Sequence, residues 1–152
     1  MSGSQTSEQL AREALEEHKL IHFYLDQISQ SLQALTPDLD DVEPMRRLAA
    51  QVEGFKERLR EHHQLEERRG LFRAIVDAMP ESRVDIVRLI KEHEKMIEIL
   101  EMARLHAQRG EPGEGAALRT DLEGFLDMFR RHEHDEERLI ARAMARENRS
   151  LD

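Results

Sequence analysis

Two segments of the chain each carry a histidine followed four residues later by a glutamate. Segment 53–68 contains His62 and Glu66, and segment 123–138 contains His132 and Glu136. On a helix this spacing places both side chains on one face, one turn apart. Imidazole nitrogen and carboxylate oxygen presented together suit iron, manganese or zinc. The two segments also share identical residues at matching positions: Glu53/Glu123, Gly54/Gly124, Phe55/Phe125, Arg60/Arg130, His62/His132, Glu66/Glu136, Glu67/Glu137 and Arg68/Arg138.

The segments lie in long stretches with helical periodicity. Apolar residues recur every three or four positions, which predicts four amphipathic helices at approximately 7–35, 44–78, 82–109 and 114–147. Thr6 and Gln9 form a predicted capping box for the first helix. Thr36-Pro37-Asp38 and Pro112-Gly113 predict loops, while Gly70 either ends the second helix or only weakens it.

Four long helices with short connections, and no strand-like alternation, predict an all-α fold. We expect an antiparallel up-down four-helix bundle that forms a single domain over 1–152. The repeated segments indicate that the bundle consists of two pseudo-repeated helical hairpins. Gly54 and Gly124, unfavourable inside helices, suggest close helix approach, and a common origin of the two halves also explains them.

One histidine falls on the apolar stripe of each predicted helix: His18, His62, His93 and His132. Glu66 and Glu136 also occupy stripe positions, where a leucine would be expected. A buried carboxylate without a counter-charge costs several kcal/mol, so bound cations would explain both glutamates. A single such histidine is more simply an isolated core or surface residue. Four of them in duplicated halves predict a dinuclear metal centre, with two metals about 3.5–4 Å apart.

The composition excludes several other classes of protein. The net charge of −9 argues against nucleic-acid binding, which needs a basic surface. The chain has no cysteine, which excludes disulfides, thiolate metal sites and cysteine nucleophiles. No apolar run approaches the roughly 18–20 residues of a membrane span, and no secretory signal is visible. We therefore expect a cytoplasmic protein that holds any metal by nitrogen and oxygen.

Over roughly residues 10–145 the pattern resembles the hemerythrin-like family, also called the HHE cation-binding domain. The matching motifs are Glu17-His18, His62-His63-x-x-Glu66-Glu67, Glu92-His93 and His132-x-x-x-Glu136-Glu137. The resemblance implies two non-haem iron ions, with Glu66 and Glu136 as bridging carboxylates. It also implies that the four stripe histidines are terminal ligands. The donors alone would equally accept manganese or zinc.

The chain departs from oxygen-carrying members of that family at two positions. Those members have a further histidine one turn after the third-helix ligand, where this chain has Ile97. They also have an aspartate five residues after the last histidine, where this chain has Glu136 at a spacing of four. His22, one turn after His18, is a further candidate ligand or else a flank residue between core and solvent. These differences favour redox turnover or sensing over reversible oxygen carriage.

Several residues next to the predicted ligands have two interpretations. Glu17, Glu67, Glu92 and Glu137 either orient imidazole N–H groups or are solvated charges. His63 and His134 lie beside the stripes, and we expect them behind the ligands or on the surface. We expect His106 on the surface.

Three functions are compatible with this pattern. The first is a di-iron protein that binds dioxygen or a related small oxidant, for oxygen or redox binding or sensing. The second is a di-iron enzyme that acts on peroxide or nitric oxide. The third is an iron store, an iron sensor or a bundle with structural metal. The expected partners are dioxygen, peroxide or nitric oxide, and the chain is expected to be a monomer or homodimer.

Overall fold

The computed structural model describes residues 5–35, 42–111 and 114–150. Over these residues the chain is all-α. Its long helices are α1 (Ser7–Ala34), α2 (Val42–Glu67), α4 (Arg83–Arg109) and α5 (Glu114–Ser150). The short helix α3 (Leu71–Ala78) and the 3₁₀ turn η1 (Pro80–Ser82) connect α2 to α4. The predicted loops at 36–38 and 112–113 lie outside the described residues.

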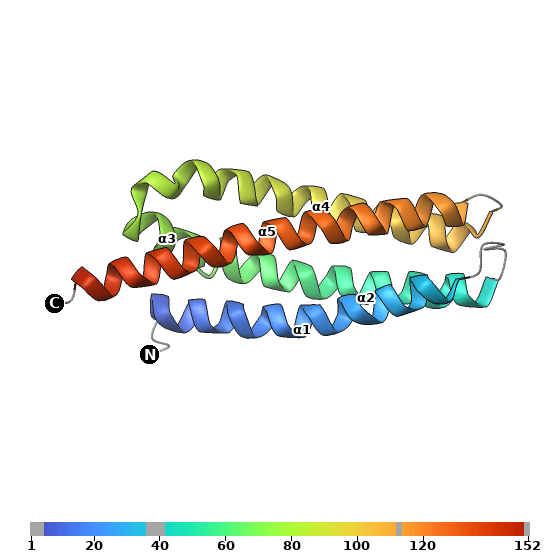
Figure 1. Cartoon of the computed structure of the whole chain (residues 1–152), viewed down its shortest axis with the longest axis horizontal. Coiled ribbons are helices and arrows are strands. Elements are labelled where there is room, and N and C mark those ends of the chain that lie inside the picture. Colours follow the sequence, from blue (N-terminus) through green and yellow to red (C-terminus); the bar gives the residue numbers. More distant parts are fainter. Residues whose placement is uncertain (1–4, 36–41, 112–113, 151–152) are drawn as a thin grey trace.

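The four long helices form a bundle along one axis (Figure 1). Each contacts two others, in the order α1, α2, α4, α5 and back to α1. The start of α1 and the end of α5 lie at the same end of the bundle as α3, and the start of α2 lies at the opposite end (Figure 1). None of the helices over the described ranges has the length and apolarity that crossing a membrane requires.

The helix ends follow the local sequence in most places. The predicted capping box is confirmed, because the Thr6 hydroxyl accepts from the Gln9 amide and the Gln9 side chain accepts from the Thr6 amide. Pro44 lies in the first turn of α2, where its missing N–H costs nothing. Ser82 precedes α4, but its hydroxyl donates to the Met79 carbonyl 2.7 Å away instead of capping the helix.

The predicted second helix at 44–78 is two helices. Gly70 has a φ of +105°, a conformation that side chains with a Cβ rarely adopt, and it separates α2 from α3. α3 then buries Leu71, Phe72 and Ile75 against the bundle. The expectation of close helix approach at Gly54 and Gly124 is wrong, since a Cβ at either position would meet nothing within 4 Å.

Two apolar clusters fill the bundle. One contains Phe55, Leu59, Leu100 and Phe125 with their neighbours, and the other contains Leu10, Leu65, Leu71 and Leu139 with theirs. The buried histidines and glutamates occur between the apolar positions of the same helices, for example His62 and Glu66 beside Leu59 and Leu65. The bundle therefore carries a group of polar side chains inside a largely apolar core.

Candidate metal centre

The structure buries all six residues that the sequence singles out as the central ligand set. Each of the four long helices contributes one histidine, and the two glutamates come from α2 and α5, one turn after their histidines. The exposed fraction is 4% or less for each of them: His18, His62, Glu66, His93, His132 and Glu136. These side chains are buried because they lie on the apolar stripes, and the apolar stripe is the face of each helix that packs against the interior of the bundle.

The inward-facing atoms of these residues form two groups. In the first group, His18 Nε2 lies 3.1 Å from His62 Nε2 and 3.0 Å from Glu136 Oε1. His62 Nε2 also lies 3.0 Å from Glu66 Oε1.

In the second group, His93 Nε2 lies 3.1 Å from His132 Nε2, and His132 Nε2 lies 3.2 Å from Glu136 Oε2. Glu66 Oε1 is 3.5 Å from His93 Nε2. Each glutamate therefore touches both groups, as bridging carboxylates would.

The other ring nitrogen of each histidine faces a carboxylate farther from the centre. His62 Nδ1 lies 2.6 Å from Glu17, and His18 Nδ1 lies 3.1 Å from Glu137. His93 Nδ1 lies 2.9 Å from Glu67.

His132 Nδ1 lies 3.4 Å from Glu92 but makes no hydrogen bond. Because an ionised carboxylate only accepts, Nδ1 is the donor in His18, His62 and His93, and this fixes ring orientation and leaves Nε2 to face inward. Of the two interpretations of the outer glutamates, the structure supports orientation of the imidazoles at these three histidines.

This arrangement fits a bound cation. With Nδ1–H donating outward, a neutral imidazole presents a lone pair at Nε2, and the two lone pairs of His18 and His62, 3.1 Å apart, have no donor between them. Both oxygens of Glu66 are buried without a hydrogen-bond partner. The site thus brings four nitrogens and two carboxylates together as acceptors. Burying so many acceptors is unfavourable unless cations or protons lie among them.

Protons offset the acceptors when no cation is bound. Burial, together with the adjacent Glu136 carboxylate, raises the pKa of Glu66 well above its usual range. Burial opposes ionisation of Glu136 as well, but the adjacent side chains of Glu66, His132 and His18 hold its pKa well below the usual range. Although burial favours neutral His62, the carboxylates of Glu66 and Glu136 raise its pKa well above the usual value. Metal binding would displace these protons, which links metal affinity to pH.

The remaining histidines are not grouped with the central donors. His22, whose side chain is 48% exposed, places Nε2 2.6 Å from Glu133 Oε1. His63 is buried and stacks on the His93 ring at a centroid distance of 3.7 Å. Burial, together with the His93 and His62 rings, lowers the pKa of His63. His134 is exposed, and His106 is partly buried, with Nε2 3.9 Å from Asp121.

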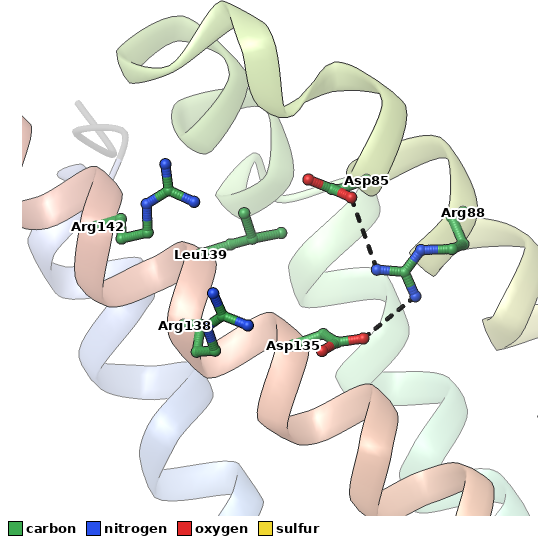
Figure 2. Close-up of a pocket in the computed structure, with 6 residues that line it drawn as sticks. All are labelled: Asp85, Arg88, Asp135, Arg138, Leu139 and Arg142. Atoms are coloured by element: carbon green, nitrogen blue, oxygen red, sulfur yellow. Dashed lines mark ion pairs between the residues drawn. The ribbon is translucent and has the colours of Figure 1, made fainter.

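An arginine on α4 supports the carboxylate behind His132. Arg88 Nη1 lies 2.9 Å from Glu92 Oε1 and 3.3 Å from Asp135 Oδ2. Figure 2 shows Arg88 between Asp85 and Asp135 at a pocket of about 240 Å³ between α4 and α5. Spacing alone did not identify this contact, because it depends on how α4 and α5 are rotated against each other.

Comparison with known proteins identifies a family. The model of the hemerythrin HHE cation binding domain matches residues 10–144, which include all six central donors and all four outer glutamates. No curated protein and no solved structure matches the chain in the corresponding searches. The match covers most of the chain, and the buried histidine and glutamate cluster fits a metal site. The chain therefore belongs to the hemerythrin HHE cation-binding family.

Proposed function

We propose that the chain is a non-haem di-iron protein that binds dioxygen or a related small oxidant. The observation that carries this proposal is the set of buried acceptors without donors: four inward-facing Nε2 atoms and two carboxylates, one of which has both oxygens unpartnered. Histidine and carboxylate donors suit iron, and family membership favours it over manganese or zinc. The proposed ligands are His18, His62, Glu66, His93, His132 and Glu136.

Two iron ions held here would supply electrons to a small oxidant. The residues of the chain have three roles around them. The histidines and bridging glutamates hold the ions. The outer glutamates fix the imidazole tautomers and strengthen the nitrogen donors. The two apolar clusters limit the access of water, which strengthens electrostatic interactions inside the centre.

Contacts in the bundle also support the proposal that the chain is an antiparallel bundle made of two pseudo-repeated helical hairpins. Outer contacts occur in matching pairs: Glu17 with His62 corresponds to Glu92 with His132, and Glu67 with His93 corresponds to Glu137 with His18. A pseudo-twofold relation between two hairpins would produce this pairing.

A difference between the two donor groups favours a second candidate function, an enzyme that acts on peroxide or nitric oxide. In the first group the ligand atoms of His18, His62, Glu66 and Glu136 all lie within 4.8 Å of one another. In the second group only those of His93, His132 and Glu136 do, and Glu66 reaches this group through a single contact of 3.5 Å with His93 Nε2. Beside His93 the surface is hollowed by a groove of about 430 Å³ that Ile97 and His63 also line. Fewer protein donors leave more coordination positions for a reacting molecule.

The test is metal content together with the visible spectrum of anaerobically reduced protein, before and after exposure to air. The proposal expects about two irons per chain, from the two donor groups, and a new near-ultraviolet or visible band on oxidation. A persistent oxygenated form supports binding, while rapid bleaching together with oxygen release from added peroxide supports the enzyme. Less than one metal per chain after iron supplementation, with the helices intact, would rule out the dinuclear site.

A further inference from the structure

A second group of metal-binding side chains lies outside the central six, on the face shared by α1 and α5. On α1, His18 and His22 are one turn apart, and on α5, Glu133 and Glu137 are one turn apart. Donor atoms of His18, Glu133 and Glu137 all lie within 4.8 Å of one another, and His22 Nε2 is 2.6 Å from Glu133 Oε1. Two helices thus present a histidine pair opposite a glutamate pair.

Glu133 is the least satisfied member of this group. Its side chain is only 13% exposed, and its Oε2 atom is buried with no hydrogen-bond partner. His22 uses the other oxygen, Oε1. A buried acceptor without a partner destabilises the folded protein, so a cation beside Oε2 would remove a penalty that the protein otherwise carries.

The pseudo-repeat provides an internal comparison for this group. When His18 is aligned with His93 and His132 with His62, His22 corresponds to Ile97, Glu133 to His63 and Glu137 to Glu67. In the half that contains His62 and His93, the aliphatic side chain of Ile97 replaces the imidazole of His22. His63, which replaces Glu133, stacks on His93. The two halves therefore match in their central donors but differ here. The difference argues that His22 and Glu133 have a use that the central site does not require.

We propose that His22, Glu133 and Glu137 form an outer divalent-cation site on the α1–α5 face. One imidazole nitrogen and two carboxylates suit manganese, ferrous iron or zinc. His22 and Glu137, whose side chains are 48% and 43% exposed, let a hydrated ion reach the site from solvent. Glu137 also lies 3.1 Å from His18 Nδ1, so the outer site directly adjoins the centre through one carboxylate.

The position of the outer site suits a role in loading the centre with iron. This role rests on the proposed function. An ion bound at Glu137 would adjoin the centre, because Glu137 contacts His18 and directly follows Glu136 on α5. The outer site concentrates ferrous iron at the α1–α5 face and thereby speeds the filling of the central positions. It does not change how much iron the centre finally holds.

The test is a titration of iron-loaded protein with Mn²⁺, in which the resonance of free aqueous Mn²⁺ is followed by electron paramagnetic resonance. We expect one Mn²⁺ bound per chain beyond the iron already present, with the iron content unchanged. His22→Ala and Glu133→Gln should each abolish this Mn²⁺ binding and keep the iron and the helical content. His134→Ala, which removes an exposed histidine next to Glu133, is the matched control and should bind Mn²⁺ like the wild type.

Different results would refute the outer site, its loading role and the proposed function. An iron-loaded wild-type protein that binds no further Mn²⁺ would overturn the outer site, as would equal binding by His22→Ala. A wild type that takes up no iron would instead refute the proposed function. The loading role is tested by the rate at which metal-free protein takes up ferrous iron. That rate should fall in His22→Ala, with the same final iron content, and an unchanged rate would overturn the role.

Discussion

Replacing Glu66 with leucine should stabilise the metal-free protein while it abolishes metal binding. Glu66 is fully buried, and neither of its oxygens has a hydrogen-bond partner. Burying a polar group without a partner costs about 1–3 kcal/mol in protein mutational data. His62 loses a neighbour 3.0 Å away in the variant, but it keeps Glu17 at 2.6 Å. We therefore expect a net gain of about 1–3 kcal/mol in the free energy of unfolding.

The pH dependence follows from the raised pKa of Glu66. A carboxyl group whose pKa is higher in the folded state stabilises that state most at low pH. This contribution declines as the pH rises above the ordinary value of 4.5 toward the folded value. Glu66→Leu removes this decline. The advantage of the variant in the metal-free state should therefore be larger at pH 8 than at pH 4.5.

The assay is urea unfolding of metal-free protein, with Glu66→Gln as the control. The glutamine keeps a buried polar group, so it should gain less than the leucine. With iron present the order should reverse, because a ligand at 1,000 times its Kd adds about 4 kcal/mol to a protein that binds it. If Glu66→Leu destabilised the metal-free protein as much as an ordinary core truncation does, the idea that Glu66 lacks hydrogen-bond partners without metal would be wrong.

Three further changes test other parts of the structure. Glu17→Gln removes the charged acceptor 2.6 Å from His62 Nδ1 and should lower metal affinity about 10–100-fold with the fold intact, as measured by chelator competition. Gly70→Ala forces a Cβ into a φ of +105° and should cost about 1–2 kcal/mol in urea unfolding; no loss would mean that the α2–α3 break is not strained. The Arg104 and Lys56 cations lower the pKa of Glu101 to about 2, so Glu101→Gln should be less stable than the wild type at pH 7, and the difference should disappear as the pH falls below about 2. This difference should stay below about 1 kcal/mol, because the Glu101 side chain is 37% exposed.

The sequence was sufficient for the long helices and for the central group of buried donors. Spacing of three and four residues identifies the inward face of a helix, and His62 with Glu66 must then lie on it together. It was not sufficient for the break at Gly70, because the apolar residues that follow continue a helical pattern and only the positive φ ends it. It left open whether Glu17 orients an imidazole, since that depends on the rotation of α1 against α2.

The same limit explains why the sequence left open whether His22 is a ligand or a flank residue. One turn from His18, it lies beside the apolar stripe, and periodicity alone does not decide whether such a residue turns toward the core or the flank. The structure places it on the flank, against Glu133 from a helix more than a hundred residues away in sequence. No spacing rule connects two such residues. Only the packing of α1 on α5 brings them together.

The outer contacts also show why the centre and the fold depend on each other. Within each hairpin one contact is internal: Glu17 holds His62, and Glu92 lies behind His132. The other contact crosses between hairpins, because Glu137 holds His18 and Glu67 holds His93. Neither hairpin can therefore orient its own two histidines without the other. Metal that binds the assembled set binds only the folded state, so its binding free energy is added to the stability of the docked hairpins.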